Sequence, residues 1–319
     1  MSDTIARPPY DLELAVALES MTEELVSLTP ELIAQARVPS LPIDDLLAAR
    51  GIEHTERTIP GPTGAPEVTI SVFRRTDHIA GGPGIFAIHG GGMVAGDRFH
   101  GIDVMLEWVE LMDAVCVSVE YRLAPEHPDP APVEDCYAGL VWTADHAEEL
   151  GFEAHRLMVA GVSAGGGLSA GVTLLARDRG APALAAQMLI CPMIDDRNDT
   201  VSSRQFAGIG VWDRGSNETG WNALLGDRRH TADVSQYAAP TRATDLSGLP
   251  PAFIDVGSAE VFRDENVAYA TAIWAAGGIA ELHVWPGAFH ASDQFVADAA
   301  LSRTATATRT AWVRRTLGA

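Results

Sequence analysis

Lysine is absent from this 319-residue sequence, so all 22 of its basic residues are arginine. Three kinds of chemistry depend on a lysine side chain: the Walker A phosphate loop, the Schiff base of pyridoxal enzymes, and the serine–lysine dyad. The sequence excludes all three. Any nucleophile in this protein must therefore give its proton to another kind of base.

Cysteine is scarce as well. The three cysteines are widely spaced and odd in number, without a C-x-x-C pair, which argues against a disulfide framework and a zinc knuckle. The sequence therefore predicts no metal site and three buried thiols, Cys116, Cys136 and Cys191. A long apolar run is missing too, because the 20 uncharged residues at 157–176 include five glycines and three hydroxyl side chains. A strand, a tight turn and a buried helix explain that run better than a membrane span.

Positive charge is in short supply, with 22 basic against 43 acidic residues and a net charge of -21. Nucleic acids are bound through clustered cations, so the sequence predicts no nucleic-acid partner. It also disfavours an anionic membrane surface. The N-terminal residues are acidic and lack the basic-then-apolar pattern of a secretion signal, which predicts a cytoplasmic protein.

The pattern of apolar residues predicts an α/β fold. Helical stretches at residues 11–26, from Pro30 onward and at 43–50 precede two alternating strands, 52–59 and 68–74, which suit an antiparallel hairpin. Short apolar strands then alternate with helices, which predicts a mostly parallel sheet with helices on both faces. The strands are expected at 84–88, 114–120, 157–160, 185–190, 252–256 and 280–284, and the helices at about 99–112, 131–150, 163–179, 263–277 and 293–316.

Residues 195–249 interrupt this alternation after the sixth strand. A structureless loop of that length is uncommon in a compact domain, and three aromatic residues, Phe206, Trp212 and Trp221, indicate one or two helices there. The insertion follows the sheet edge at which ligands bind in such folds. We therefore expect a single domain over residues 1–319, with a cap formed by about 1–50 and about 195–249. The three aromatic residues are candidate substrate contacts.

A G-x-S-x-G motif, formed by Gly161, Ser163 and Gly165, lies between the strand at 157–160 and the following helix. A serine at the apex of a sharp strand-to-helix turn has a strained backbone, and residues two before and two after it must lack side chains. The motif predicts Ser163 as a nucleophile. Such a serine needs a base, a group that orients the base, and donors for an oxyanion.

The oxyanion donors are expected upstream of the serine. Three successive glycines after His89 close the strand at 84–88, where their free amides can point into a cavity. We interpret the amides of Gly91 and Gly92, together with that of Ala164, as the donors. A flexible glycine turn is the alternative for the tetrapeptide taken alone.

The base and the acid are expected downstream, because the chain order on a sheet of this kind is serine, acid, histidine. His290 lies between the last strand and the last helix, which is the required loop. The loop after the strand at 252–256 offers Glu260, Asp264 and Glu265 as the acid. Glu260 is favoured because it lies on the turn itself, whereas Asp264 opens a helix, where the helix dipole accounts for an acidic residue.

These motifs together make the chain similar to the hormone-sensitive-lipase-like, or bacterial family IV, esterases of the α/β-hydrolase superfamily. The resemblance covers nearly the whole chain. It rests on His89-Gly90-Gly91-Gly92, on Tyr121 to Pro128 with Glu134-Asp135, on Gly161 to Gly166, on Gly257-Ser258-Ala259-Glu260 with Arg263-Asp264-Glu265, and on Phe289-His290.

The resemblance implies an α/β-hydrolase fold and a serine carboxylesterase that hydrolyses short- to medium-chain acyl esters. Ser163 would be the nucleophile, His290 the base and Glu260 the acid. No cofactor or metal is implied, the partner is a small-molecule ester, and a homodimer is compatible with the family. The chain departs from the family pattern in three places: Val162 stands where an acidic residue is frequent, Glu260 where aspartate is more frequent, and Ala291 where glycine is usual.

Three alternative functions are each compatible with part of the sequence. Lactones and amides are alternative substrates for the same site. Residues 165–170 formally satisfy a dinucleotide-binding G-x-G-x-x-A pattern, but the glycines begin inside the helix and no acid follows about 20 residues on. A binding protein on the same fold, such as the plant gibberellin receptors, would lack the catalytic histidine. Here the serine, the histidine and an acid are all present.

Overall fold

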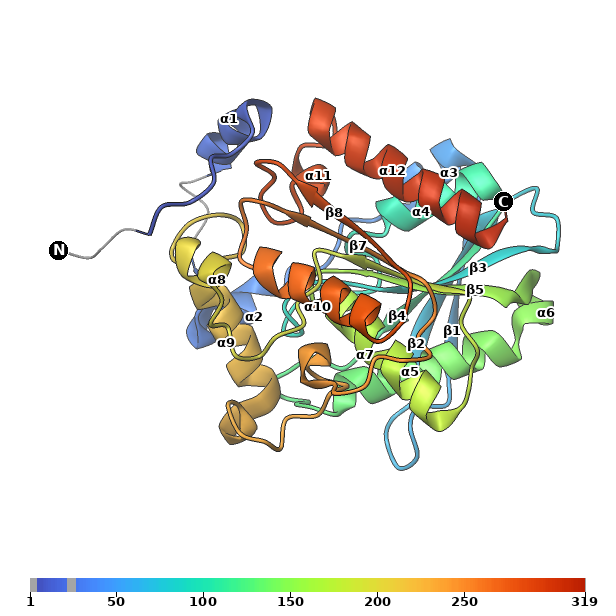
Figure 1. Cartoon of the computed structure of the whole chain (residues 1–319). Coiled ribbons are helices and arrows are strands. Elements are labelled where there is room, and N and C mark those ends of the chain that lie inside the picture. Colours follow the sequence, from blue (N-terminus) through green and yellow to red (C-terminus); the bar gives the residue numbers. More distant parts are fainter. Residues whose placement is uncertain (1–4, 22–26, 319) are drawn as a thin grey trace.

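The computed structural model describes residues 5–21 and 27–318 (Figure 1). The first predicted helix is present as α1 (Leu12–Met21), and the end of that prediction, at 22–26, lies outside the described residues. The other predicted N-terminal helices are a short 3-10 turn, η1 (Pro30–Leu32), continued by α2 (Ile33–Ala36), and α3 (Asp44–Arg50).

One eight-stranded sheet forms the centre of the molecule, with the order β1-β2-β4-β3-β5-β6-β7-β8. The predicted hairpin is confirmed, since β1 pairs antiparallel with β2, and β2 pairs antiparallel with β4. All other neighbouring strands are parallel. The strands are β1 (Ile52–Ile59), β2 (Val68–Arg75), β3 (Gly82–Ile88), β4 (Val115–Glu120), β5 (Phe152–Val162), β6 (Ala186–Ile190), β7 (Ala252–Gly257) and β8 (Ala280–Trp285).

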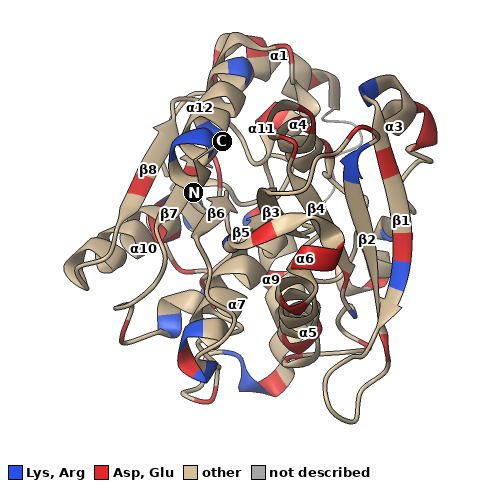
Figure 2. Cartoon of the chain, turned by 90° about the vertical axis from the view of Figure 1, so that its right-hand side faces the viewer, with Lys and Arg blue, Asp and Glu red and all other residues tan. Residues whose placement is uncertain are grey.

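Helices cover both faces of the sheet, as the alternation of strands and helices predicts. Figures 1 and 2 show α4 and α12 on one face and α5, α7 and α10 on the other. The inner strands are accordingly buried along almost their whole length. These helices are α4 (Asp103–Met112), α5 (Ala131–Asp145), α7 (Ala164–Arg179), α10 (Arg263–Ala275) and α12 (Ala300–Leu317). The chain therefore has an α/β-hydrolase fold.

Two of the predicted helices are each divided into two. The stretch at 131–150 breaks at His146, whose ring and backbone amide both bond the Trp142 carbonyl, and α6 (Ala147–Leu150) follows. The stretch at 293–316 divides into α11 (Ser292–Phe295) and α12. There the amide of Ala300 donates to the Glu13 carboxylate at 2.7 Å. A side chain distant in sequence thus caps α12, which no local pattern could indicate.

The insertion lies beside the N-terminal segment. It contains two α-helices, α8 (Val201–Gln205) and α9 (Arg214–Leu225), and two short 3-10 turns, η2 (Gly226–Arg228) and η3 (Pro240–Arg242). Two hydrogen bonds join α9 to Leu28. The amide of Leu28 donates to Ser216 Oγ, and Thr219 Oγ1 donates to the Leu28 carbonyl. Figure 1 shows α1, α2, α8 and α9 at one end of the sheet. Within residues 5–21 and 27–318, no helix has the length and apolar character needed to span a membrane.

A buried arginine links β7, α11 and α12. Arg309, from α12, donates to Asp255 at the end of β7 at 2.7 Å and also to Asp293 in α11. Trp285 donates to the same Asp255 oxygen at 2.9 Å. The two carboxylates raise the pKa of the Arg309 guanidinium, which therefore stays charged although it is buried. The loop between β8 and α11 is held through this ion pair.

Replacing Arg309 with methionine should lower the free energy of unfolding by about 3–5 kcal/mol, because two buried carboxylates lose their counter-ion. The matched control is Arg314→Met on the exposed side of α12, where a change within about 0.5 kcal/mol is expected. Urea unfolding followed by circular dichroism measures both. Equal stability of the two variants would contradict this account of the ion pair.

Candidate active site

Ser163 lies at the turn between β5 and α7 with φ 58° and ψ -121°, a conformation that side chains rarely adopt. Its carbonyl accepts from the amides of Gly167 and Met193, each at 3.0 Å. The flanking glycines are required by close contact. A Cβ at Gly161 would lie 2.3 Å from the Gly165 carbonyl, and a Cβ at Gly165 would lie 2.0 Å from the oxygen of Ile88.

Three side chains form a buried hydrogen-bonded line across three loops. His290 Nε2 lies 2.9 Å from Ser163 Oγ, and His290 Nδ1 lies 2.7 Å from Glu260 Oε2. The other Glu260 oxygen accepts from the Gly257 amide at 3.0 Å, so the carboxylate is held from both sides. Ser163, His290 and Glu260 are 7%, 5% and 2% exposed. Such an arrangement gives the serine a neighbouring base whose ring orientation is set by an acid.

The other two candidate acids lie in the first turn of α10 and have different partners. Asp264 accepts from the amide of Ser202, at the start of α8, at 2.8 Å. Glu265 accepts from the backbone amides of Ile194 and Asp195, at 3.0 and 3.2 Å. Burial raises the pKa of Glu265 well above the usual range. Both residues attach the insertion to α10, and neither has a hydrogen bond to the imidazole.

The glycine loop lies next to the serine. Gly91 and Gly92 have φ values of 104° and 62°, and within the described ranges their amides donate to no protein acceptor. Ala164 is the first residue of α7, where a helix leaves its amides unpaired. Gly91, Gly92 and Ser163 line the same cavity, and the Ala164 amide follows the serine directly in the chain. An anion that forms there would find donors already in place.

His89 supports the glycine loop and lies outside the serine–histidine pair. Its ring stacks on Tyr121 at 4.1 Å between centroids, and its Nδ1 donates to the Gly90 carbonyl at 2.8 Å. Tyr121 donates to the His89 carbonyl at 3.1 Å. Burial lowers the pKa of His89 to about 4, so the ring is neutral at ordinary pH.

A cavity of about 340 Å³ opens onto Ser163, His290 and the glycine loop. Of the three predicted aromatic contacts, only Trp212 lines it, and its ring lies so close to Gly92 that a Cβ there would be 2.4 Å from Cη2. Phe206 and Trp221 are fully buried elsewhere and do not line this cavity. Their aromatic character reflects packing of the insertion.

The sequence interpretation did not single out several residues that line this cavity. They come from loops and short helices without a recognisable motif, so only the folded chain brings them together: His100, Gly101, Asp103, Val211, Gln294 and Phe295. Two of the positions at which this chain differs from the family pattern also lie here. Val162 ends β5 and lines the cavity. Ala291 has φ 54°, a left-handed conformation that explains why glycine is usual at this position.

A strained serine between a parallel strand and a helix, paired with a histidine and an acid from later loops, defines an α/β-hydrolase. A family model described as alpha/beta hydrolase fold matches residues 85–294. The carboxylesterase NlhH of Mycobacterium tuberculosis (strain CDC 1551 / Oshkosh) is 34% identical over 99% of both chains. The chain belongs to the hormone-sensitive-lipase-like family of α/β-hydrolases, and it is a carboxylic ester hydrolase.

Solved structures agree with this assignment. A structure titled bacterial heroin esterase is 38% identical, with a TM-score of 0.88 over 97% of this chain and 98% of that chain. A thermostable esterase from Pseudomonas putida ECU1011 is 28% identical, with a TM-score of 0.85 over 98% of this chain and 99% of that chain. The similarity therefore extends over the N-terminal segment and the insertion as well as the sheet.

Replacing Gly161 with alanine should destabilise the fold by more than the about 1–3 kcal/mol of ordinary overpacking, because the new Cβ meets backbone atoms. Gly180→Ala is the matched control, since Gly180 has φ 78° and nothing within 4 Å of the added Cβ. Backbone strain alone should cost that control about 1–2 kcal/mol. Urea unfolding compares the two, and a Gly161→Ala protein as stable as the control would refute the steric argument.

Proposed function

We propose that this protein is a serine carboxylesterase in which Ser163, His290 and Glu260 form the catalytic triad. The observation that carries the proposal is the buried line of hydrogen bonds from the serine through both nitrogens of the imidazole to the glutamate, at 2.9 and 2.7 Å. The amides of Gly91, Gly92 and Ala164 form the oxyanion hole. Glutamate replaces the more frequent aspartate without changing the chemistry, because both are carboxylates.

The first step is acylation of the serine. His290 Nε2 takes the proton from Ser163 Oγ as this oxygen attacks the ester carbonyl, and the three backbone amides stabilise the oxyanion of the tetrahedral intermediate. The imidazolium then gives its proton to the leaving alcohol. Glu260 stays ionised, accepts from Nδ1, and so keeps Nε2 free to act as the base.

The second step is hydrolysis of the acyl-enzyme. A water molecule takes the place of the alcohol and gives a proton to His290 Nε2 as it attacks the acyl carbonyl. The same amides stabilise the second oxyanion. Return of the proton to Ser163 releases the carboxylic acid and restores the enzyme. Apart from the ester and the water molecule, each step uses groups of this chain.

The N-terminal helices and the insertion form a cap over the site. This division of the single domain is supported by the contact of Trp212 with Gly92 and by the hydrogen bonds between Leu28 and α9. The cap places Trp212 and Val211 against the substrate cavity. Trp212 is therefore the aromatic residue of the insertion that we propose as a substrate contact.

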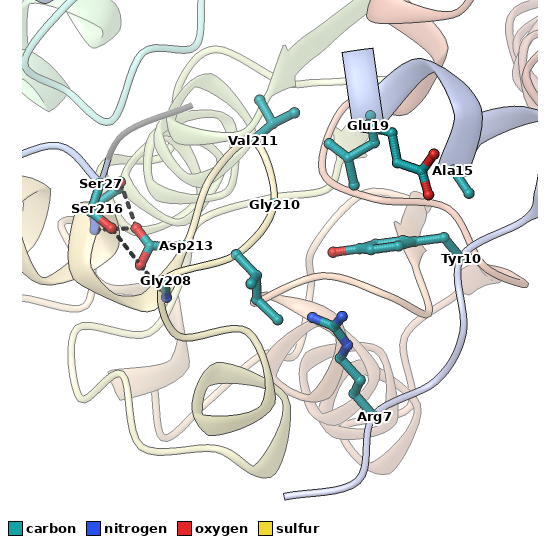
Figure 3. A pocket seen from close by; sticks show the side chains of 12 residues that line it. Arg7, Tyr10, Ala15, Glu19, Ser27, Gly208, Gly210, Val211, Asp213 and Ser216 are labelled. Atoms are coloured by element: carbon teal, nitrogen blue, oxygen red, sulfur yellow. Dashed lines mark hydrogen bonds between the residues drawn. The ribbon is translucent and has the colours of Figure 1, made fainter. Parts of the chain in front are cut away.

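The substrate is an ester with a short- to medium-chain acyl group. A cavity of about 340 Å³ is near the lower end of the about 300–1,000 Å³ that ligand pockets occupy. A second cavity, of about 410 Å³, lies between α1 and the insertion (Figure 3) and is lined by Tyr10, Leu18 and Gly210. Val211 lines both cavities. We propose that a longer acyl chain extends past Val211 toward this second cavity.

Steady-state kinetics with p-nitrophenyl acetate tests the triad. Ser163→Ala should lower kcat by about 10⁴-fold or more, and Glu260→Ala should lower it by about 10³–10⁴-fold, because the imidazole loses its orientation. Asp264→Ala is the control, with a decrease of less than about tenfold, since its contacts are structural. A larger loss for Asp264→Ala than for Glu260→Ala would reassign the acid. Absence of any turnover that depends on Ser163 would refute the esterase mechanism.

The acyl series tests the role of Val211. Val211→Trp should lower kcat/KM for p-nitrophenyl octanoate relative to the acetate by about tenfold, because the larger ring would fill space beside the residue that both cavities share. Val201→Trp, on the exposed side of α8, is the control and should leave the ratio unchanged. An equal decrease for both esters in Val211→Trp would instead indicate general damage and contradict the second cavity as an acyl site.

A further inference from the structure

A third side chain lies beside the His290–Glu260 pair. Cys191 follows β6 with φ 36°, is 4% exposed, and donates its backbone amide to the Asp255 carbonyl at 2.7 Å. The ester mechanism gives this thiol no task. The other two cysteines, Cys116 in β4 and Cys136 in α5, are also buried.

The three side chains together carry the donors of a soft-metal site. Cys191 Sγ, one Glu260 oxygen and one ring nitrogen of His290 all lie within 4.8 Å of one another. Metal bonds of about 2.0–2.3 Å to these donors place ligand atoms about 3.3–3.8 Å apart in a tetrahedral site. Among residues 5–21 and 27–318, no other group of three such side chains lies this close. An ion held by these donors would replace the hydrogen bond between His290 Nδ1 and Glu260 Oε2, whose atoms are 2.7 Å apart.

The donor set selects the kind of ion. Thiolate, imidazole and carboxylate suit Zn²⁺ and the softer Cd²⁺, whereas Mg²⁺ and Ca²⁺ prefer oxygen ligands alone. Burial, and then the nearby Glu260 carboxylate, raise the pKa of the Cys191 thiol well above its usual range. The ion binds the thiolate, so the thiol proton must leave when the site is occupied. The substrate cavity reaches His290 and gives an ion a path to the imidazole.

We propose that Cys191, Glu260 and His290 form an inhibitory site for a soft divalent cation of the Zn²⁺ or Cd²⁺ type. The bound ion takes the Cys191 thiolate, one Glu260 oxygen and Nδ1 of His290, the ring nitrogen that faces Glu260. The thiol proton is released to solvent, and the proton of Nδ1 moves to Nε2. A protonated Nε2 cannot accept the Ser163 proton. Occupation of the site and turnover of an ester exclude each other. The inhibition rests on the proposed role of His290, whereas binding of the ion does not.

Titration with Cd²⁺ alone tests binding without any need for turnover. The full-length protein should show one ultraviolet thiolate-to-cadmium charge-transfer band with a stoichiometry of one ion per chain. Removing a group that only hydrogen-bonds a metal ligand costs about 10–100-fold in metal affinity. Removing a ligand should cost at least as much, so Cys191→Ser and His290→Ala should each weaken binding at least tenfold. Cys136→Ser is the matched control and should bind like the unaltered protein. A band that is absent, or that persists unchanged in Cys191→Ser, would overturn the site.

The same titration, followed by hydrolysis of p-nitrophenyl acetate, tests inhibition. Activity should fall in proportion to the band and return when EDTA is added. The activity of each variant is compared with its own activity without metal. The Cd²⁺ concentration that halves the activity of Cys191→Ser should rise by at least the factor by which its dissociation constant for Cd²⁺ rises. A band that depends on Cys191, together with undiminished turnover, would overturn the inhibition and would also argue against His290 as the base. Failure of the site and failure of the mechanism are thus distinguishable.

Discussion

Two backbone segments approach each other at Ser163 more closely than side chains would allow, and the active site depends on this approach. The end of β3 and the start of α7 are in contact at Gly165. A Cβ on Gly165 would lie 2.0 Å from the carbonyl oxygen of Ile88, so only glycine fits there. The contact brings the serine turn to the beginning of the glycine loop. Donors for an oxyanion and the hydroxyl of Ser163 are then neighbours without any movement of the chain, which is the preorganisation that stabilises developing charge.

The glycine loop also supports the insertion. The ring of Trp212 occupies the space where Gly92 would carry a side chain, and Gly220 of α9 lies near enough to the Gly92 carbonyl that a Cβ would be 3.0 Å away. The size of the cavity and the position of the proposed oxyanion donors therefore depend on the same contact. A change in the insertion that moves Trp212 would alter both.

Arginine carries the buried electrostatics of this lysine-free chain. Arg122 and Arg242 each form two parallel hydrogen bonds to a fully buried carboxylate, on Asp135 and Asp196 respectively, at 2.7–2.8 Å. A planar guanidinium can satisfy both oxygens of a carboxylate, whereas an ammonium group acts as a single point of charge. Arg309 pairs with two carboxylates, those of Asp255 and Asp293, and so joins β7 to α11. The carboxylates of these three arginines thereby have structural roles.

The sequence by itself determined the strand order along the chain, the serine turn, the glycine loop and the residues expected to act with them. These features depend on local backbone requirements, such as the absence of a Cβ at Gly161, and on the period of apolar residues. The position of Glu260 on the turn already favoured it as the acid, but only the tertiary structure shows that His290 contacts Glu260 while Asp264 and Glu265 accept from backbone amides elsewhere. The tertiary structure also decided that Trp212 lines the cavity while Phe206 and Trp221 are packed away, and that Cys191 lies beside the imidazole. Contacts of this kind join residues 30 or more positions apart, so no local pattern specifies them.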